Sequence, residues 1–211
     1  MAHVQPFTTH TGVAAPIMQD NIDTDQIIPS REMKTVSGEG LGKGLFAGQR
    51  YLSPDTRDLN PDFVLNKPQH EDASILLAGA NFGCGSSREH AVWALADFGI
   101  RCVIAESFGA IFQANCGRNG VLPISLDRAA IDAMAALVAR VAQRHQIEVN
   151  LDKQWVRVTE GPKNEYDFQI DPYQKRLLIG GLDPVNLTSK RQVDIDAFFQ
   201  RDASARPWIY E

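Results

Sequence analysis

Short apolar runs alternate with amphipathic stretches through the centre of the chain. The runs predict buried strands at 75–80, 101–105 and 121–124. The segments between them, 87–98 and 108–115, have the length and composition of helices. Because strands that alternate with helices favour a parallel sheet with right-handed crossovers, we expect a βαβαβ unit here.

The pattern changes after this unit. Apolar residues recur at helical spacing behind Asp127, a candidate N-cap, which predicts an amphipathic helix packed on the core. Alternation with a period of two then predicts a hairpin formed by residues 147–151 and 155–158, and one more strand at 166–170. A last helix is expected at 173–182. The tail, 185–211, has low regularity apart from a short helix at 195–200.

The N-terminal third carries turn signals in place of periodic segments. Residues 12–22 begin as a short segment of mixed apolar and polar residues, and an acidic turn follows at 20–25. Pro29 then stops any helix. Four glycines at 37–44 predict a mobile or tightly turned loop. The prolines within 53–72 argue against a helix and predict a long excursion.

The candidate chemistry is concentrated in residues 79–90, Gly-Ala-Asn-Phe-Gly-Cys-Gly-Ser-Ser-Arg-Glu-His, directly after the first predicted strand. The glycines allow a sharply turning backbone that approaches a ligand closely. Ser86 and Glu89 have the spacing of a capping box, so we expect a helix to begin at Ser86. Backbone N–H groups at a helix N-terminus favour an anion. Ser86 or Ser87 could be held there as an unusually acidic hydroxyl, beside the guanidinium of Arg88.

A plain strand-to-helix turn is the simpler interpretation of this loop, but it needs neither the second serine nor the arginine. The loop lacks the Gly-Lys-Ser/Thr end of a P-loop, the spacing of a dinucleotide fingerprint and the Gly-x-Ser-x-Gly of a nucleophile elbow. A second candidate is the turn formed by Asp23, Thr24 and Asp25, although such a turn alone is more often solvated loop than site.

Composition narrows the class of protein. The 211 residues carry a net charge of −5, with no long basic tract and no apolar run that could span a bilayer, which argues against nucleic acid and membrane partners. No secretory signal is visible, so we expect a cytoplasmic protein. Cys84, Cys102 and Cys116 are too few and too widely spaced for a disulfide framework or a metal site, and no metal ligand is expected on this chain.

Two segments together carry a family resemblance. Asn-Ile-Asp-Thr-Asp-Gln-Ile-Ile-Pro at 21–29 and Asn-Phe-Gly-Cys-Gly-Ser-Ser-Arg-Glu-His-Ala at 81–91 resemble the small subunits of 3-isopropylmalate dehydratases, the free-standing version of the aconitase C-terminal swivel domain. The likeness covers nearly the whole chain and weakens after about residue 185. It implies an α/β swivel domain over 1–211, with a mostly parallel central sheet, helices and extra C-terminal strands. Residues 31–72 would be its mobile, substrate-selecting and partner-facing loops.

The resemblance also implies a reaction. Family enzymes move water between adjacent carbons of a di- or tricarboxylic acid by elimination and re-addition, here between 2-isopropylmalate and 3-isopropylmalate in leucine biosynthesis. A [4Fe-4S] cluster with one open iron binds the substrate hydroxyl as a Lewis acid, and it lies on a separate large subunit. This chain would carry no cofactor, and it would be active only in a heterodimer or heterotetramer with that cluster-bearing subunit.

Roles for individual residues follow from their positions in the family motifs. Ser86 would act as the base, used as an alkoxide, and Asp25 would line the site from the first turn as a second catalytic group. Ser87 and Arg88 would bind a substrate carboxylate. Thr24 would be a further substrate-binding residue.

The selecting segment leaves the substrate open. Met33 and Lys34 would contact the substrate, but isopropylmalate-type members usually have an aromatic residue and Leu where this chain has Glu32 and Met33. A related hydratase for citraconate, methylmalate, dimethylmalate or homoaconitate-type acids therefore remains an alternative. A non-catalytic module that binds a carboxylate or phosphate is the alternative from another class. A nucleotide-binding α/β domain is disfavoured because no phosphate motif is found.

Overall fold

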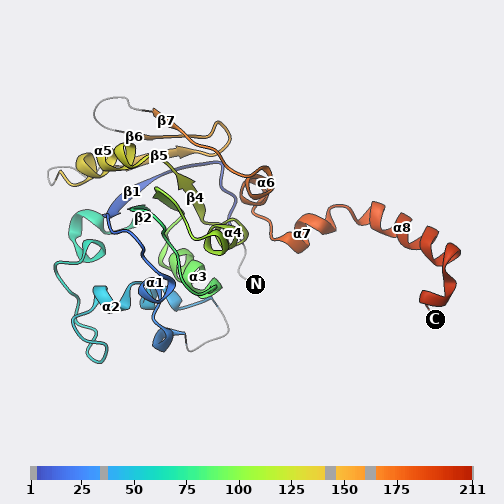
Figure 1. Ribbon diagram of the computed structural model, residues 1–211, viewed down its shortest axis with the longest axis horizontal. Coiled ribbons are helices and arrows are strands. Elements are labelled where there is room, and N and C mark those ends of the chain that lie inside the picture. The colour runs from blue at the N-terminus through green and yellow to red at the C-terminus, as the bar shows by residue number, and fades with distance from the viewer. Residues whose placement is uncertain (1–3, 34–37, 141–145, 160–164, 211) are drawn as a thin grey trace.

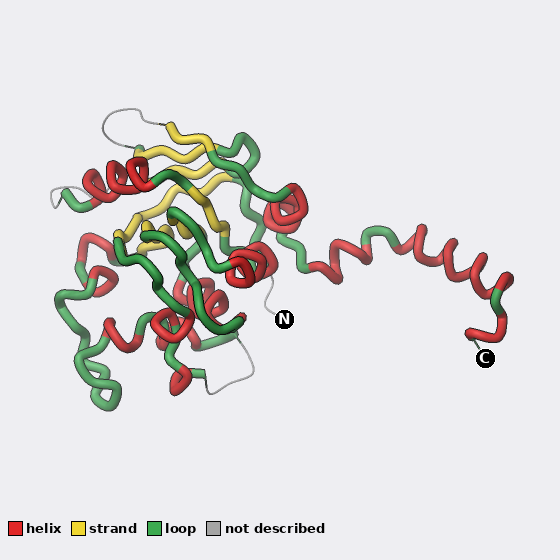
Figure 2. Tube along the Cα trace, in the orientation of Figure 1, coloured by secondary structure: helices red, strands yellow, loops and turns green. Residues whose placement is uncertain are grey.

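The computed structural model describes residues 4–33, 38–140, 146–159 and 165–210. Within these residues one mixed sheet is wrapped by helices, and two further helices extend away from it toward the C-terminus (Figures 1 and 2). The predicted α/β class, with a largely parallel centre and additional C-terminal strands, is confirmed.

Seven strands form the sheet in the order β4-β3-β2-β1-β5-β6-β7. Neighbours from β1 to β4 run parallel, whereas β5 is antiparallel to β1 and continues as an antiparallel meander. Their bounds are β1 Thr9–Ile17, β2 Ala73–Ala78, β3 Cys102–Ala105, β4 Leu122–Ser125, β5 Gln146–Asn150, β6 Trp155–Val158 and β7 Glu165–Asp167.

The central strand, β1, is the one that the sequence analysis missed. Its apolar part is interrupted by Pro16, which cannot donate to a ladder and argues against a central strand. The structure accommodates Pro16 because the pairing of β1 with β5 covers only Thr9 to Val13. Pro16 lies beyond that pairing and is opposite Leu77 of β2 alone.

Eight α-helices accompany the sheet in the described part of the chain. Their bounds are α1 Thr24–Ile27, α2 Ala47–Arg50, α3 Glu89–Phe98, α4 Ala110–Arg118, α5 Arg128–Val138, α6 Pro172–Gly180, α7 Pro184–Ser189 and α8 Gln192–Ala205. Short 3₁₀ turns add Ser30–Glu32, Leu41–Gly44, Val64–Asn66, Pro68–His70 and Pro207–Ile209. None of these helices is long and apolar enough to cross a membrane.

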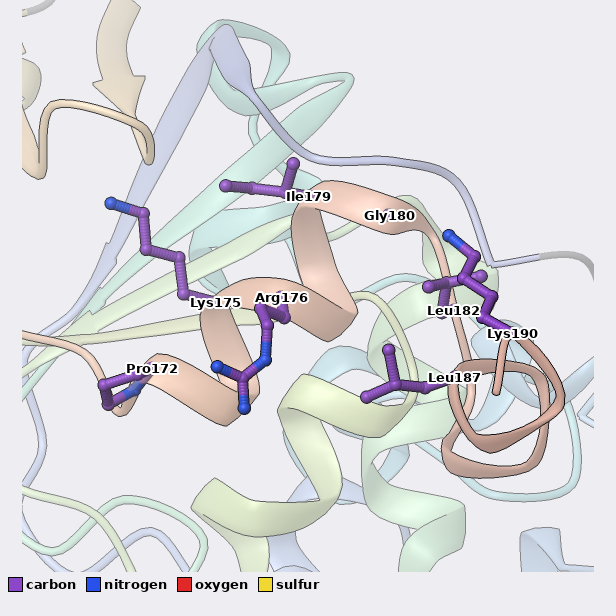
Figure 3. A pocket seen from close by; sticks show the side chains of 8 residues that line it. All are labelled: Pro172, Lys175, Arg176, Ile179, Gly180, Leu182, Leu187 and Lys190. Carbon is purple, nitrogen blue, oxygen red and sulfur yellow. The ribbon is translucent and has the colours of Figure 1, made fainter. Parts of the chain in front are cut away.

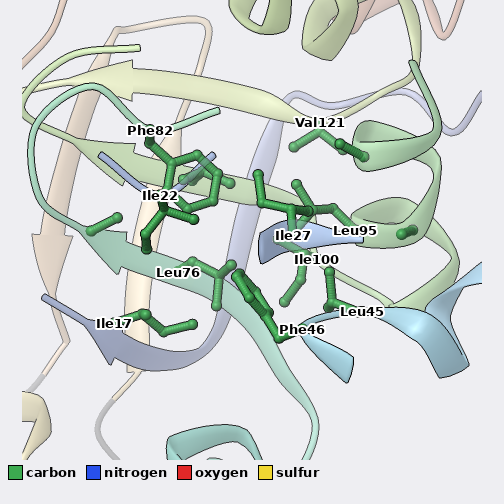
Figure 4. Close-up of a cluster of buried hydrophobic side chains, with 14 of the residues drawn as sticks. Ile17, Ile22, Ile27, Leu45, Phe46, Leu76, Phe82, Leu95, Ile100 and Val121 are labelled. Carbon is green, nitrogen blue, oxygen red and sulfur yellow. The ribbon is translucent and has the colours of Figure 1, made fainter. Parts of the chain in front are cut away.

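Both faces of the parallel part of the sheet are buried. Leu76 and Ala78 of β2 join a cluster with side chains from α1, α3 and α4, part of which is drawn in Figure 4. The intervening Ile75 and Leu77 point to the opposite face and join a second cluster with α5, β5 and β6. This two-sided burial explains why β2 reads as a continuous apolar run in the sequence.

Residues 38–72 contribute more to the core than their turn-rich sequence suggests. Leu41, Leu45, Phe46, Phe63 and Leu65 are buried in the same cluster as α3. The 3₁₀ turn at Leu41–Gly44 packs closely on α3, where the N–H of Gly42 donates to Asp97 Oδ2 at 2.7 Å. The expected mobility of 31–72 stays a prediction, but this segment is tied into the fold at several points.

The predicted capping box at Ser86 and Glu89 is wrong. Helix α3 begins at Glu89, three residues later than expected, and Glu89 accepts a hydrogen bond from Asn119 Nδ2 at 2.9 Å. The capping box that forms belongs to α1, in the acidic turn. There the N–H of Gln26 donates to Asp23 Oδ1 at 2.7 Å and the N–H of Asp23 donates to Gln26 Oε1 at 2.9 Å.

The C-terminal tail is more regular than predicted. The short helix expected at 195–200 is the middle of α8, and α7 precedes it. Neither helix contains a buried residue, and Figure 1 shows both of them extending away from the sheet. Because neither helix buries a residue, no pattern of core-facing apolar positions could have revealed them in the sequence.

The capping box makes a stability prediction. Asp23→Ala should lower the free energy of unfolding by about 1 kcal/mol, because it leaves the first N–H groups of α1 without a side-chain acceptor. For a domain of this size the midpoint of thermal unfolding should fall by roughly 2–4 °C.

Asp127→Ala is the matched control, since Asp127 occupies the N-cap of α5 without a side-chain capping bond. Calorimetry of both variants should show the larger loss for Asp23→Ala. Equal losses would mean that the capping box of α1 contributes nothing.

Candidate active site

A pocket of about 320 Å³ lies at the carboxyl ends of β1, β2 and β3, the edge where parallel α/β sheets usually bind ligands. The loops that follow these three strands and the first turn of α4 form its walls. Its lining residues are Thr24, Asn81, Gly83, Cys84, Gly85, Ser86, Ser87, Arg88, Gly109, Ala110, Ile111 and Phe112.

Main-chain hydrogen bonds join the acidic turn to the glycine loop. The N–H of Gly83 donates to Ile22 O at 2.7 Å, and the N–H of Thr24 donates to Cys84 O at 3.0 Å. The buried hydroxyl of Thr24 donates to Ser86 O at 3.0 Å. These three hydrogen bonds, which we call the loop clasp, hold together two segments about 60 residues apart in the sequence. They set the position of Ser86.

Gly83 is required by the geometry of this clasp. Its φ is +72°, a conformation that side-chain-bearing residues rarely adopt, and a Cβ there would lie 2.2 Å from the ring of Phe112. Phe112 in turn packs edge-on against Phe82, with ring centroids 5.4 Å apart. The aromatic core under the pocket therefore approaches the loop backbone directly.

Two helix N-termini meet at the pocket. The loop carrying Ser86, Ser87 and Arg88 leads into α3, as expected, and α4 begins at Ala110 on the opposite wall. Each helix carries a partial positive charge at this end. Among the described residues no acceptor is hydrogen-bonded to the N–H groups of residues 86–88. The pocket is therefore electropositive although the whole chain is acidic.

Ser86 and Ser87 are exposed, and Arg88 above them is held by partners from the acidic turn. Nη1 of Arg88 donates to Asp25 Oδ1 and, at 3.2 Å, to Ser30 Oγ. The hydroxyl of Ser30 donates to Asp25 Oδ1 at 3.1 Å, which closes a three-membered network. Both partners use the same nitrogen, so among the described contacts the Nε–Nη2 edge of the guanidinium is left for another ligand.

The structure brings together most, but not all, of the predicted site residues. Thr24, Ser86, Ser87 and Arg88 line the pocket, and Asp25 reaches it through Arg88. Met33 is half-buried against the core and is not among the pocket-lining residues. Lys34 lies outside the described residues.

Two pocket-lining residues, and a third residue that holds Arg88, were missed as functional candidates. Ser30 holds Arg88, Asn81 donates from Nδ2 to Asn21 Oδ1 at 2.9 Å, and Ile111 exposes 55% of its surface at the pocket wall. The sequence signal for Ile111 was an apolar residue in the first turn of a helix that follows a strand of the parallel sheet. Nothing in the local sequence of Ser30 indicates its contact with Arg88.

Glu32, the unusual residue of the selecting segment, does not line the pocket. Its carboxylate accepts from Arg57 Nη2 at 3.0 Å, and its side chain is only 14% exposed. Arg57 also donates to Lys43 O at 2.9 Å and stacks on the ring of Tyr51. Glu32 thus ties the 3₁₀ turn at Ser30–Glu32 to Arg57, which in turn bonds to Lys43.

The cysteines of this chain do not fit an iron–sulfur cluster. Cys102 and Cys116 are fully buried on opposite faces of the sheet, and burial raises the pKa of both thiols. Cys84 lines the pocket, whereas Cys102 and Cys116 are not among the pocket-lining residues. Across the described part of the chain no group of three His, Cys, Asp or Glu residues could hold a metal ion.

A larger groove, of about 460 Å³, lies between α6 and α7 (Figure 3). Its floor is aliphatic and its rim carries Lys175, Arg176 and Lys190. It contains neither a nucleophile nor a carboxylate, and it shares no residue with the glycine loop. The smaller pocket is therefore the candidate active site.

Comparison with known proteins supports the fold and shows the family. The aconitase C-terminal domain family matches residues 4–129. The 3-isopropylmalate dehydratase small subunit of Cupriavidus necator is 53% identical over 207 residues, which is 98% of this chain and 99% of that protein. The protein of the same name from Afipia carboxidovorans is 48% identical over 206 residues, covering 98% and 100% of the two chains.

A solved structure has the same architecture. The crystal structure of a 3-isopropylmalate dehydratase from Methanocaldococcus jannaschii superimposes with a TM-score of 0.65 at 27% identity. The match covers 90% of this chain and 98% of that one.

The burial of two thiols predicts selective labelling. Iodoacetamide at neutral pH should modify Cys84 in the folded protein and leave Cys102 and Cys116 unmodified, because both are buried and their raised pKa values leave little thiolate. Peptide mapping by mass spectrometry reads out each site. The Cys84→Ala variant should take up no label until guanidinium unfolds it, and rapid labelling of Cys102 in the native state would contradict the burial.

The Glu32–Arg57 pair predicts how the selecting segment is held. Arg57→Glu should speed hydrogen exchange of the backbone N–H of Glu32, which donates to Pro29 O at 2.8 Å, because two like charges then repel. The double variant Glu32→Arg with Arg57→Glu should recover much of the protection. Exchange that is equally fast in the single and double variants would show that the ion pair does not position the segment.

Proposed function

The chain belongs to the aconitase C-terminal domain family and, within it, to the 3-isopropylmalate dehydratase small subunits, and we propose that it supplies one wall of the active site of such a hydro-lyase. The observation that carries the proposal is the convergence of Ser86, Ser87 and Arg88 on a pocket between two helix N-termini. The reaction would interconvert 2-isopropylmalate and 3-isopropylmalate by dehydration and rehydration in leucine biosynthesis.

Ser86 is the proposed base. It would take the proton from the carbon next to a substrate carboxylate and return a proton to that face during rehydration. A serine hydroxyl is a very weak acid, so its alkoxide needs strong compensation. The N-termini of α3 and α4, the backbone N–H groups of residues 87 and 88 and the guanidinium of Arg88 offer positive charge at this place.

Arg88 is the proposed carboxylate ligand. Asp25 and Ser30 hold its Nη1, so the Nε–Nη2 edge can make two parallel hydrogen bonds to a substrate carboxylate. In this proposal Asp25 contributes to catalysis by orienting the guanidinium of Arg88. Thr24 contributes by donating a hydrogen bond to the carbonyl oxygen of Ser86, which positions that residue. Ser87 would add a hydroxyl to the same carboxylate site.

The apolar wall of the pocket favours a substrate with an alkyl group. Ile111 presents its side chain to the pocket next to the ring of Phe112. An isopropyl group could pack there while the carboxylates meet Arg88 and the helix N-termini. Citraconate, methylmalate and dimethylmalate carry smaller alkyl groups, and a panel of 2-hydroxy diacids would rank them against isopropylmalate.

A partner is required by this function. The Lewis acid that activates the substrate hydroxyl would be a [4Fe-4S] cluster, and the described residues of this chain contain no group of three side chains that could hold a metal ion. We therefore place the cluster on a large subunit that covers the mouth of the pocket. The small subunit would contribute proton transfer and carboxylate binding, and it would be inactive alone.

Ser86→Ala tests the base. With the large subunit reconstituted under anaerobic conditions, kcat for isopropylmalate should fall by roughly 10²–10⁴-fold, as is usual when a general base is removed. KM and the affinity between subunits should change little, because Ser86 is an exposed loop residue.

Ser87→Ala is the matched control, one hydroxyl lost at the neighbouring position, and it should chiefly raise KM. Near-normal turnover by Ser86→Ala would reject Ser86 as the base. If the wild-type pair binds a dicarboxylate but never exchanges its carbon-bound proton with solvent, the alternative of a non-catalytic binding module would replace the enzyme.

A further inference from the structure

The segment after α6, residues 184–210, contains α7, α8 and the final 3₁₀ turn, and we call it the C-terminal arm. It leaves the body of the protein at the groove between α6 and α7 and extends away from the sheet (Figures 1 and 3). No residue of α7, α8 or the final turn is buried. The arm therefore receives little stabilisation from the rest of the chain.

The arm carries most of the large apolar side chains that are exposed among the described residues. Of eleven large apolar side chains that are exposed, seven lie on it: Val185, Val193, Phe198, Phe199, Trp208, Ile209 and Tyr210. Single exposed apolar residues are normal on a soluble protein, but such a concentration on one short segment marks an interaction surface. Trp208, at 69% exposure, and Phe198, at 51%, are residue types that dominate binding energies at interfaces.

The tip of the arm is already folded into a defined shape. Asp202 accepts a hydrogen bond from the Tyr210 hydroxyl at 2.7 Å and an ion-paired bond from Arg206 Nε at 2.8 Å. The ring of Tyr210 lies edge-on to Phe199, with centroids 6.2 Å apart. The last residues are thus folded back onto α8, while Phe198 and Trp208 stay exposed, and this ordering reduces the entropy lost on binding.

Isolation of the arm implies that a partner stabilises it. Helices shorter than about 12–15 residues are marginal in water without tertiary contacts. Helix α8 has 14 residues and its ion pairs are local, such as Arg191 with Asp194. Burial of the aromatic residues of α8 on the surface of a partner would supply the stabilising tertiary contacts that the rest of this chain does not provide.

We propose that the C-terminal arm is a docking element for the cluster-bearing large subunit. This inference rests on the proposed function. The family domain covers residues 4–129, which include the entire pocket, and its description as a C-terminal domain indicates that in aconitases it is covalently joined to the rest of the protein. A free-standing subunit lacks that link and the high effective concentration that it provides.

The C-terminal arm is large enough to contribute substantially to such an interface, and the similar small subunits match it. The small subunits of Cupriavidus necator and Afipia carboxidovorans match 98% of this chain, so the matched length includes nearly all of the arm. Four aromatic side chains of the arm, which are 45% to 69% exposed, offer on the order of 300–500 Å². A stable interface needs about 800 Å² from each partner, so the arm and the rim of the pocket together would suffice.

The groove between α6 and α7, which we call the root of the arm, is positively charged at its rim and indicates the charge of the surface that would bind there. Lys175, Arg176 and Lys190 surround an aliphatic floor of Ile179, Leu182 and Leu187. Helix α6 packs on α4, the helix whose first turn forms a wall of the active-site pocket, so the root adjoins the body that carries the site. The matching surface of the large subunit should be apolar with carboxylates around it.

The test titrates the large subunit with full-length variants of this chain and follows both binding and turnover. Phe198→Asp and Trp208→Asp should each raise the dissociation constant at least tenfold. At saturating concentration both should restore wild-type kcat, because the arm holds the subunits together and does not touch the reacting atoms. Gln200→Asp is the matched control, since it adds the same charge to α8 two residues from Phe198 and should bind normally.

Circular dichroism should first show that each variant is folded, as expected for exposed positions. Unchanged affinity of both aromatic variants would overturn the docking proposal and leave the proposed function intact. If the free chain is a dimer that Phe198→Asp makes monomeric, without any effect on the large subunit, the arm joins two copies and the proposal is wrong. Absence of binding by the wild-type chain would reject the docking proposal and the proposed function together.

Discussion

The active site depends on the loop clasp, the set of hydrogen bonds between the turn after β1 and the glycine loop after β2. Gly83 to Ile22 and Thr24 to Cys84 join the two backbones, and the Thr24 hydroxyl holds the carbonyl of Ser86. Everything proposed for the site uses that junction: it places Asp25 beneath Arg88, and it directs the loop toward the N-terminus of α4. The positive φ of Gly83 and the ring of Phe112 below it explain why the loop has no freedom to rearrange.

The sequence predicted the parallel centre of the fold because its strands are buried on both faces and its helices have one apolar stripe. It missed β1, whose Pro16 violates a local rule and is accommodated only by the end of the pairing with β5. It placed a capping box at Ser86 and Glu89, where the sequence spacing fits, whereas the structure forms one at Asp23 and Gln26. The contact of Ser30 with Arg88 joins positions 58 residues apart and has no local signature. The family motifs supplied the site residues that local patterns could not.

The structure suggests a division of labour within an assembled enzyme. This chain offers positive charge from two helix ends and one oriented guanidinium, and an exposed serine between them. Two of its three cysteines are fully buried, and its described residues include no group of three side chains that could hold a metal ion. The proposed large subunit would complete the pocket, and the C-terminal arm would hold it there without entering the chemistry. The contact of Glu32 with Arg57 holds the turn that precedes the proposed substrate-selecting loop.

The central claim is that Ser86 of this chain faces the carbon that loses its proton. The most direct measurement is a structure of the chain assembled with its large subunit and bound isopropylmalate. The account predicts Ser86 Oγ about 3–3.5 Å from that carbon, with the adjacent carboxylate on the Nε–Nη2 edge of Arg88. A substrate bound with Ser86 Oγ directed away from that carbon, or with a group of the large subunit in its place, would contradict it.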